Sequence, residues 1–461
     1  MHLFHKEIDF PQRIPTFLNY QISELYLYSI TMRNILILGA GRSSGVLIDY
    51  LVEKSAEQQW QLVVGDITAE QALQKTRNRP NTKAVSFDTY NEINRRKMIS
   101  EADIVISMLP ATLHIIIAED CIKLKKNLVT PSYISDAMRS MDEEVKKKKL
   151  VFMNEIGLDP GIDHMSAMHI IQQLKSEGNT ITGFRSHCGG LVAPESDDNL
   201  WHYKFSWNPR NVVLAGQGEG KILYLKNGKK VQLQYEELFG HTSELKIKGY
   251  GKFESYPNRD SLKYVSQYGL KGVKTMYRGT LRRPPYCKGW DALVKLGFTS
   301  HKQTFTTQFQ HLVEKGMKDK KIITNKQTEK LIQSISIVPM LFLHKEKTVI
   351  PSDLLLNVLQ HSWSMQPGDK DMVVMVHEVE YQGKRKKKKT LESSLVYTGK
   401  DADHTAMAAT VGLPVAMVTK MILNGEVKRT GVLMPSHPEI YNPILAELKK
   451  HGISFKEKIT E

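Results

Sequence analysis

The stretch RNILILGAGRSSGVLIDYLVEK, residues 33–54, constrains the fold of this chain more than any other segment. Its apolar run ILIL predicts a strand buried on both faces, as in a parallel sheet. A glycine-rich turn follows, and a helix begins directly after it. In this context Gly39 permits the tight turn, Gly41 lets the backbone approach a pyrophosphate, and the helix N-terminus supplies free N–H groups. We therefore predict a dinucleotide site; the alternative is a plain turn between strand and helix.

The segments after this turn repeat the alternation of strand and helix. Further strands are predicted at WQLVVGD, KAVSFD, ADIVISMLP, NLVTPSY and LVFMNEIG. Such alternation predicts an α/β domain with a doubly wound parallel sheet. Ligands bind at the carboxyl ends of strands in these sheets. The strand ends ISMLP, TPSY and NEIGLDPG should therefore meet where a nicotinamide ring would lie.

The pattern changes in the second part of the chain. FRSHCGGL, YKFSW, VVLAG, KILYLKNGKKVQL and ELKIKGYGKFESYP predict mainly antiparallel strands, with KNGKK as a turn. Residues 290–370 are mostly helical and polar, and DMVVMVHEVEY and TLESSLVYTG predict a hairpin around a lysine run. MAATVGLPVAMVTKMILNG predicts an apolar helix before a short tail.

Composition limits the class of protein. A chain of 461 residues predicts two or three domains, and 41% apolar with 25% charged residues describes a soluble globular protein. No apolar run approaches the ~18 residues of a membrane span, and residues 1–31 do not read as a signal peptide. The three scattered cysteines, Cys121, Cys188 and Cys287, predict a reducing, cytoplasmic location without disulfides or zinc.

The net charge of +15 comes largely from two lysine-rich runs, at 146–149 and 384–389. One interpretation is nucleic-acid binding. We favour solvated helix ends and a hairpin tip, because no aromatic residues are interleaved with these lysines. We therefore expect neither a nucleic acid nor a membrane as partner. A basic surface would also attract anionic substrates and dinucleotides.

Asp66 ends the second predicted strand, 27 residues after Gly39. An acid at this place accepts hydrogen bonds from the adenosine ribose hydroxyls and repels a 2′-phosphate. These residues alone predict NAD in preference to NADP. The alternative is an acid that simply faces solvent at a strand end.

The stretch NEIGLDPGIDHM, residues 154–165, raises a separate question. Asp159 and Asp163 flank a Pro-Gly turn, and His164 follows, so the stretch could hold a catalytic dyad, a metal ion or only a helix start. Asp163 and His164 are adjacent, which suits a helix-capping aspartate better than a dyad. We expect no metal, because no second histidine or carboxylate lies at helical ligand spacing.

Several longer motifs occur in a fixed order along the chain: GAGRSSG, ADIVISMLP, SYIS, MNEIGLDPGIDHM, CGGLVAPESDDN, YKFSWNPR, YPNRDS, RGTLR and MAATVGLPVA. In these motifs the chain, from about Met32 to the C-terminus, resembles the glutamate-forming saccharopine dehydrogenases, also called saccharopine reductases. The resemblance implies an oxidoreductase of lysine metabolism that acts on a CH–NH group. It converts saccharopine, nicotinamide dinucleotide and water reversibly to L-glutamate and α-aminoadipate semialdehyde. Family members with an NADP preference carry a basic residue where this chain has Asp66.

The resemblance also implies how the chain divides into parts and assembles. Together with the patterns above it predicts an arm at 1–31, a Rossmann domain at 32–158, and an α/β substrate domain at 159–289 and 371–404. A helical insertion at 290–370 interrupts the substrate domain. A C-terminal helix and tail at 405–461 pack back on the Rossmann domain. A homodimer is the expected assembly.

Site residues are implied in the same way. Saccharopine carries three carboxylates, which suit arginine donors. The substrate-binding residues expected from the motifs are Ser132, Tyr133, Asp159, Arg259, Thr280, Leu281 and Arg282, with Arg283 and Arg210 as weaker candidates. The expected cofactor-binding residues are Gly39, Gly41, Arg42, Ser43, Ser44, Asp66, Leu109, Pro110, Ser132, Tyr133, Asp159, Pro160, Gly161, Trp207 and Asn208, with Ser206 nearby.

The reaction needs a group that moves protons, because the amine must be neutral to expel hydride and water must then add. The candidates are Asp159, Tyr133, Cys188 and His187. Alternative functions are a carboxynorspermidine dehydrogenase or homospermidine synthase, which would want acids in place of Arg259 and Arg282. A lysine-forming saccharopine dehydrogenase and a non-catalytic dinucleotide sensor are further alternatives.

Overall fold

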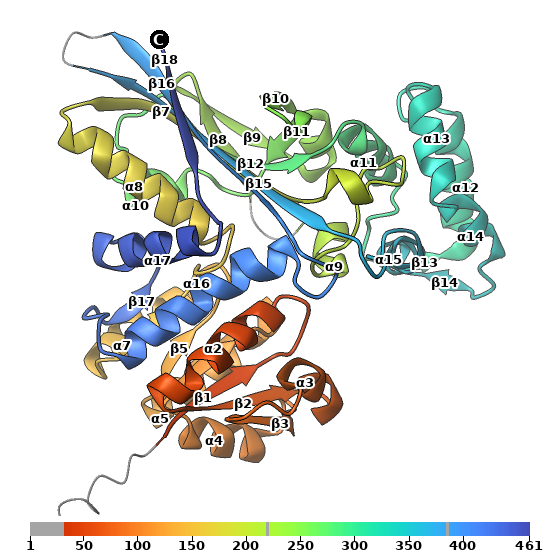
Figure 1. The fold of residues 1–461 in the computed structure, drawn as a ribbon. Helices are drawn as coiled ribbons and strands as arrows, with labels where there is room; N and C mark the ends of the chain where they lie inside the picture. Colours follow the sequence, from red (N-terminus) through yellow and green to blue (C-terminus); the bar gives the residue numbers. More distant parts are fainter. Residues whose placement is uncertain (1–31, 218–220, 384–386) are drawn as a thin grey trace, which may run out of the picture.

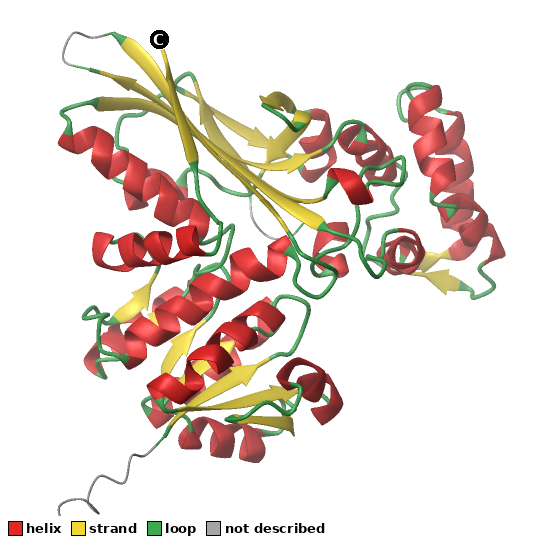
Figure 2. Cartoon of the chain, in the orientation of Figure 1, coloured by secondary structure: helices red, strands yellow, loops and turns green. Residues whose placement is uncertain are grey.

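A computed structural model of the chain describes residues 32–217, 221–383 and 387–461. The predicted arm at 1–31 and part of the second lysine run, 384–386, lie outside these residues. The described chain contains a seven-stranded sheet and a nine-stranded sheet, and helices lie between them and around them (Figure 1). The separation of the two sheets and the helical part that projects to one side are clearest in Figure 2.

The seven-stranded sheet is parallel throughout, with strand order β17-β6-β5-β4-β1-β2-β3. The prediction of a doubly wound parallel sheet is therefore confirmed. All the predicted strands of this domain are present, and a seventh, β17, comes from the segment predicted as a tail. The strands are β1 (Arg33–Leu38), β2 (Trp60–Asp66), β3 (Thr82–Ser86), β4 (Ile104–Ser107), β5 (Asn127–Val129), β6 (Val151–Met153) and β17 (Gly431–Leu433).

Three helices of this domain begin at polar caps, at Thr68, Asn91 and Ser135. Thr68 accepts a hydrogen bond from the backbone of Gln71, and Ser135 accepts one from Met138. The segment after Ser135 forms two short helices that meet at Met141. The helices are α2 (Gly45–Gln58), α3 (Ala69–Thr76), α4 (Glu92–Glu101), η1 (Ala111–Leu113), α5 (His114–Leu124), α6 (Asp136–Ser140) and α7 (Asp142–Lys147).

The nine-stranded sheet has a main path of β10-β11-β12-β7-β15-β16-β18, with β8 paired to β12 and β9 to β8. Strand β7 runs parallel to β12 and antiparallel to β15, so the sheet is mixed rather than wholly antiparallel. The hairpin predicted around the lysine run is confirmed as β15 and β16. Its strands are β7 (Thr180–Val192), β8 (Ile222–Lys226), β9 (Lys229–Leu233), β10 (Ser243–Ile247), β11 (Gly251–Pro257), β12 (Thr275–Arg282), β15 (Asp371–Gln382), β16 (Lys388–Thr398) and β18 (Lys456–Thr460).

Two predicted strands are wrong. YKFSW forms no strand beyond an isolated bridge at Phe205, and VVLAG forms the end of helix α9 (Pro209–Val213) and the turn after it. The side chain of Asn208 caps this helix by accepting the N–H of Asn211, and proline occupies the first helical position. These local signals outweigh the β-propensity of the valines.

Helices also cover and extend the nine-stranded sheet. The helical part predicted at 290–370 is mainly helical, with a short antiparallel pair, β13 and β14, at its base. The elements of this half are α8 (Ile162–Ser176), η2 (Pro194–Ser196), η3 (Tyr235–Gly240), α10 (Lys263–Gln267), α11 (Tyr286–Lys295), β13 (Thr304–Phe305), α12 (Thr306–Lys318), α13 (Lys326–Ser334), α14 (Ile337–Leu343), β14 (Thr348–Val349) and α15 (Pro351–Ser362).

Helix α16 (Ala406–Leu423) lies between the two sheets and packs on both α2 and β15 (Figure 1). Contrary to expectation, it is long and apolar enough to cross a membrane by length and composition, but 78% of it is buried inside the protein. The chain then forms β17, packs α17 (Pro438–Lys450) against α8, and ends in β18. Because β18 pairs with β16, the expectation that the whole tail packs on the Rossmann side is wrong.

Candidate functional site

The glycine turn has the geometry that a dinucleotide requires. Gly39 has a φ of 102°, and a Cβ there would lie 2.9 Å from the carbonyl oxygen of Met108. Around Gly41, no atom of the described residues lies within 4 Å of the place a Cβ would take. Ser44 is buried, and its hydroxyl donates to the carbonyl of Gly41 at 2.8 Å. The turn therefore leaves space above Gly41 for a pyrophosphate at the start of α2, where Arg42 and Ser43 are also placed.

Asp66 stands beside this turn. One of its carboxylate oxygens accepts the backbone N–H of Ala40 at 2.6 Å, and the other accepts that of Ile67 at 2.7 Å. The carboxylate therefore stays at the end of β2, where an adenosine ribose would lie. On the other side of the turn, Arg42 donates to the carbonyl of Phe205 at 2.7 Å and so joins the turn to the KFSW segment of the second domain.

A buried histidine joins the ends of β4 and β5. The Nδ1 atom of His114 is 2.8 Å from the Ser107 hydroxyl, and its Nε2 atom is 2.7 Å from that of Ser132 and 3.2 Å from that of Thr130. Burial lowers the pKa of His114 to about 4, so the ring is neutral near pH 7. The sequence prediction included Ser132 but missed His114. Leu109 and Pro110 lie in the loop that precedes α5, at the same edge of the sheet.

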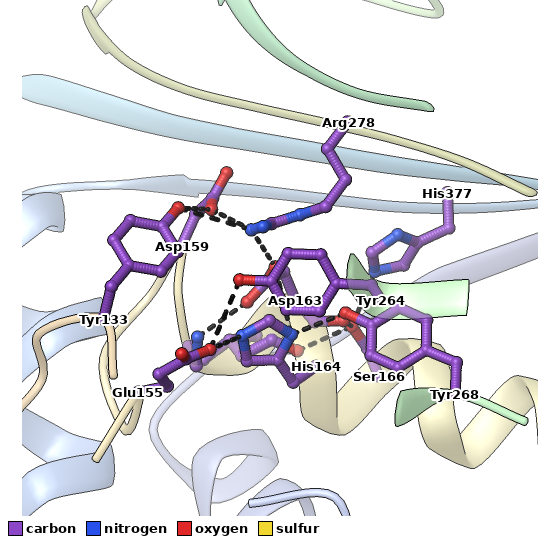
Figure 3. Close-up of polar contacts among 12 residues, drawn as sticks. Tyr133, Glu155, Asp159, Asp163, His164, Ser166, Tyr264, Tyr268, Arg278 and His377 are labelled. Carbon is purple, nitrogen blue, oxygen red and sulfur yellow. Dashed lines mark hydrogen bonds and ion pairs between the residues drawn. The ribbon is translucent and has the colours of Figure 1, made fainter. Parts of the chain in front are cut away.

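Arg278 is the centre of a buried polar network that includes Tyr133 and Asp159 (Figure 3). Its guanidinium pairs with the carboxylates of Asp159 and Asp163, the second at 2.6 Å, and lies 3.5 Å from the hydroxyl of Tyr133. The guanidinium carbon is also 4.4 Å from the ring centroid of Tyr264. One guanidinium therefore pairs with two carboxylates of the same stretch, four residues apart, and compensates one of their two negative charges. The sequence prediction missed Arg278, although the residue opens the quoted motif RGTLR.

Asp159 is the member of this network that a substrate can reach. Its side chain is 14% exposed, whereas that of Asp163 is fully buried. The hydroxyl of Tyr133 donates to Asp159 at 3.0 Å. Burial raises the pKa of Asp159, and the neighbouring Asp163 raises it further, against the opposing effect of Arg278. A carboxylate with a raised pKa beside a cleft is suited to accept and return a proton.

The NEIGLDPGIDHM stretch holds no isolated dyad. Asp163 accepts the N–H of Gly161 at 2.6 Å, and its second oxygen binds Arg278. The prediction that Asp163 caps the helix is wrong, because Gly161 is the N-cap residue of α8 and Asp163 is the second residue of the helix. His164 contacts the carboxylate of Glu155 at 2.8 Å and lies 3.5 Å from that of Asp163. A Cβ on Gly161, beside Pro160, would lie 2.0 Å from a backbone oxygen, and its φ is 147°, so only glycine fits. Among the described residues no cluster of His, Cys, Asp or Glu could hold a metal ion.

Two of the predicted proton-transfer candidates are poorly suited to the role. Burial raises the pKa of Cys188 well above its ordinary value, and Asp159 and Asp163 raise it further, so the thiol stays protonated. His187, the next residue along β7, has its Nδ1 atom 2.8 Å from the hydroxyl of Ser255. Side chains alternate along a strand, so His187 faces away from the side of the sheet that carries Cys188.

Arg282 is buried without an acidic partner. Its side chain is 3% exposed, and no Asp or Glu in the described part of the chain forms a salt bridge with it. The guanidinium lies 4.9 Å from the ring centroid of Tyr203, 5.8 Å from that of Tyr256 and 5.2 Å from that of Tyr286. Its Nη1 donates to the carbonyl of Leu281 at 2.8 Å, and its Nε is buried without a partner. This cation therefore has donors left for an anionic ligand.

The other predicted substrate residues divide between the two faces of the sheet. Thr280 lies between Arg278 and Arg282 on one face by the period of two along β12. Leu281 is buried in an apolar cluster with residues of the opposite face, so its side chain does not reach the cleft. Arg259 is exposed, with its guanidinium 5.1 Å from the ring centroid of Tyr133.

Two weaker arginine candidates have partners away from Arg282. Arg283 lies over the ring of Phe253 and donates to a backbone carbonyl, and Arg210 forms an exposed ion pair with Asp353 at 3.0 Å. The contacts of both arginines therefore lie away from Asp159 and Arg282.

The segment from Ser206 to Asn208 lies near the glycine turn through the contact between Arg42 and Phe205. Ser206 is buried, and the indole N–H of Trp207 donates to the hydroxyl of Tyr203 at 3.2 Å. Asn208 is exposed and caps α9. Trp207 is therefore linked to the tyrosines around Arg282, whereas Asn208 has a local structural role.

A second buried histidine gives a prediction for stability against pH. His377 lies between the rings of Phe184 and Phe455, and its Nε2 atom is 2.6 Å from the hydroxyl of Ser166. Burial lowers its pKa from 6.5 to about 4, so the unfolded chain binds a proton at a higher pH than the folded chain does. The contribution of His377 to the free energy of unfolding should therefore be fully present above pH 6.5 and be lost as the pH drops towards 4. Between pH 6.5 and 5 this loss should be about 2 kcal/mol.

The replacement His377→Gln keeps a hydrogen-bonding partner for Ser166 but cannot titrate. We expect the loss of Tm between pH 7 and pH 5 to be smaller in this variant than in the wild type. His169→Gln is the matched control, since His169 is exposed. Parallel Tm curves for the wild type and His377→Gln would contradict the prediction.

Comparison with known proteins finds a dinucleotide-binding part followed by a second domain, in the same order as the two sheets of this chain. Residues 35–153 match the family model described as the saccharopine dehydrogenase NADP binding domain, and residues 157–453 match the saccharopine dehydrogenase C-terminal domain. The chain is 34% identical over 449 residues to the NADP(+)-dependent, L-glutamate-forming saccharopine dehydrogenase of Saccharomyces cerevisiae. This alignment covers 92% of the chain and 99% of the yeast protein.

Two further comparisons extend this result. The solved apo structure of the L-glutamate-forming saccharopine dehydrogenase of Saccharomyces cerevisiae matches with a TM-score of 0.79 at 33% identity, over 93% of this chain and 100% of that one. The mitochondrial alpha-aminoadipic semialdehyde synthase of Mus musculus is 33% identical over 94% of this chain. The match covers 49% of the mouse protein, so the chain spans about half of that relative's length.

Proposed function

Because the chain belongs to the saccharopine dehydrogenase family, we propose that it is an L-glutamate-forming saccharopine dehydrogenase. It oxidises saccharopine with a nicotinamide dinucleotide and water, giving L-glutamate and α-aminoadipate semialdehyde, and the reaction is reversible. It is an oxidoreductase that acts on the CH–NH group of its donor, in lysine metabolism.

The observation that carries this proposal is the pair of buried arginines on one face of β12. Arg278 and Arg282 are four residues apart, which is about 13 Å along a strand. Arg278 is already paired with two aspartates, whereas Arg282 has no carboxylate partner among the described residues. A long substrate with carboxylates at separate positions, such as saccharopine, can supply the missing anion. A polyamine cannot, because it would place a second cation beside Arg282.

The residues of the cleft have distinct tasks in this reaction. When bound, the oxidised nicotinamide accepts the hydride that leaves the carbon bearing the secondary amine. Asp159 takes the proton of that amine, so that the nitrogen lone pair can form the C=N bond as the hydride leaves. Tyr133 and Arg278 hold Asp159 in place through the contacts described above. Asp159 can then return the proton as water adds to the C=N bond and the carbon–nitrogen bond breaks, which releases glutamate and the semialdehyde.

The experiment that tests the function is an assay of the purified chain with saccharopine and either NAD or NADP. Formation of reduced nicotinamide is followed, and the released amino acid is identified. Glutamate as product supports the proposal, whereas lysine would indicate the lysine-forming reaction. If neither cofactor is reduced although dinucleotide binds, polyamine imines are the next substrates to test, and then the non-catalytic sensor.

For the cofactor, the chain binds NAD or NADP, and we propose that it prefers NAD. The carboxylate of Asp66 is fixed beside the glycine turn by the N–H groups of Ala40 and Ile67, where it would face a 2′-phosphate. The name of the yeast relative specifies NADP(+). The difference in cofactor between this chain and the yeast relative should therefore depend on the negative charge of Asp66.

Asp66→Asn is expected to lower the ratio of kcat/KM for NAD to that for NADP by about 10-fold, because it removes a like charge close to the 2′-phosphate. The amide oxygen still accepts the N–H of Ala40, so the turn should keep its shape. Asp103→Asn is the matched control, because Asp103 accepts the N–H of Asn34 at 2.6 Å at the opposite edge of the sheet. An unchanged ratio in Asp66→Asn would contradict the role of Asp66.

We also propose a cytoplasmic homodimer. Cys121, Cys188 and Cys287 are all free and buried, which suits a reducing compartment. The dimer rests on the family resemblance alone. Light scattering after size-exclusion chromatography measures the assembly, and fractionation of cells measures the location.

A further inference from the structure

The loop that carries Tyr133 is held on both sides by one acidic residue. The backbone N–H of Glu155 donates to the carbonyl of Ser132 at 3.0 Å, and its carboxylate accepts the backbone N–H of Ile134, also at 3.0 Å. Glu155 therefore binds the residue before Tyr133 and the residue after it. This double contact fixes the backbone from which the Tyr133 side chain reaches Asp159.

The other carboxylate oxygen of Glu155 is held from the second domain. It lies 2.8 Å from the Nε2 atom of His164 and 3.4 Å from the hydroxyl of Tyr264 (Figure 3). His164 in turn contacts the hydroxyl of Tyr268 through its Nδ1 atom at 2.5 Å. Glu155 is 1% exposed, so these partners replace water entirely around the carboxylate. Both carboxylate oxygens of Glu155 are thus held by hydrogen-bonding partners, as a residue that fixes its neighbours requires.

The charge and the backbone of Glu155 agree with this role. Burial by itself would raise its pKa, but hydrogen bonds from His164 and from the N–H of Ile134 lower it to about 2. The residue has a φ of 52°, a left-handed conformation that strains a residue with a β-carbon. Such strain persists where the surroundings fix the backbone, and it is frequent at functional sites.

We propose that Glu155 is a positioning residue that holds the hydroxyl of Tyr133 against Asp159 during saccharopine oxidation. The inference rests on the function proposed above. Glu155 has no contact with the Asp159 carboxylate and acts on it through the Ser132–Ile134 backbone. Tyr133 in turn donates to Asp159, the group that takes the amine proton.

A double-mutant cycle on kcat tests the proposal with Glu155→Ala, Tyr133→Phe and the combined variant. Glu155→Ala is expected to lower kcat about 100-fold, since a misplacement of about 1 Å at a reacting group can have an effect of that size. In the Tyr133→Phe background the same change should lower kcat by less than about 3-fold, because the hydroxyl that Glu155 positions is already absent. Glu155→Gln keeps an acceptor for Ile134 and should remain within about 5-fold of the wild type, given the similar shape of the amide.

The matched control is Asp120→Asn. Asp120 is as buried as Glu155 and binds Arg95 and Arg96 on the outer layer of the Rossmann domain. This variant should lower Tm while kcat stays within about 2-fold of the wild type, because stability and catalysis depend on different contacts. If Glu155→Ala does not fold, Glu155→Asp, which is one methylene shorter, replaces it in the cycle.

The possible results separate the two proposals. Fully additive losses of kcat in the combined variant, or a wild-type kcat in Glu155→Ala, overturn the positioning role. If the wild-type chain oxidises saccharopine, the assigned reaction stands in either case. A wild-type chain that does not oxidise saccharopine overturns the assigned reaction, and the positioning role with it.

Discussion

Replacing Arg282 by alanine is expected to raise KM for saccharopine about 100-fold and to leave the dissociation constant of the dinucleotide within about 2-fold. Arg282 is 3% exposed and lacks an acidic partner in the described part of the chain, so the substrate carboxylate that it binds is fully desolvated. Loss of one partner in such a pair leaves the other charge buried alone, which is costly. Steady-state kinetics with saccharopine and a separate titration of the dinucleotide measure the two effects.

Arg283→Ala is the matched control for this prediction. Arg283 is the next residue, but its guanidinium lies 4.4 Å from the ring centroid of Phe253, on the other face of the strand. The control removes the same charge from the same region and should leave KM unchanged. Equal losses of saccharopine and dinucleotide binding in Arg282→Ala would show that Arg282 supports the structure rather than the substrate.

The parts of the site that could be predicted from the sequence depend on neighbours along the chain. A strand, a glycine turn and a helix within about 20 residues are enough to place Gly39 and Gly41, since the turn itself dictates which residues fit. Asp66 follows from the end of the next strand. The place of the NEIGLDPG stretch could be predicted because three successive strands of a parallel sheet end at one edge, whereas the role of Asp159 within it was implied by the family resemblance. In each case the inference needs only local geometry and the rule that ligands bind at that edge.

The parts that were missed depend on pairings between distant segments. Arg278 is 119 residues from Asp159, and its sequence neighbours give no sign that it is buried against two carboxylates. Glu155 was part of a quoted motif, but its contacts with Ser132 and Ile134 exist only after β5 and β6 are paired. Strand β17 is only three residues long and is recognisable as a strand only beside β6. Such roles follow from the register of the sheets, which the sequence pattern alone does not specify.

The two arginines of β12 should respond differently to removal, because only Arg278 neutralises buried carboxylates. Arg278→Met is expected to destabilise the chain by about 3–5 kcal/mol at pH 7, because it leaves the carboxylates of Asp159 and Asp163 buried without a cation. It should also abolish most activity, since the pKa of Asp159, already raised by burial, would rise further. Thermal unfolding of the variant and the wild type, together with kcat for saccharopine, measures both effects.

The destabilisation of Arg278→Met should shrink as the pH falls. A carboxyl whose folded pKa lies above its unfolded value favours the fold below the unfolded value and loses that contribution as the pH rises through the folded value. The ordinary pKa of Asp159 is 3.8, so the difference in Tm between Arg278→Met and the wild type should narrow from pH 7 towards pH 4. Arg282→Ala, which leaves no carboxylate alone, should show no such narrowing. A gap in Tm that stays constant with pH would mean that Arg278 stabilises the chain by packing rather than by neutralising these aspartates.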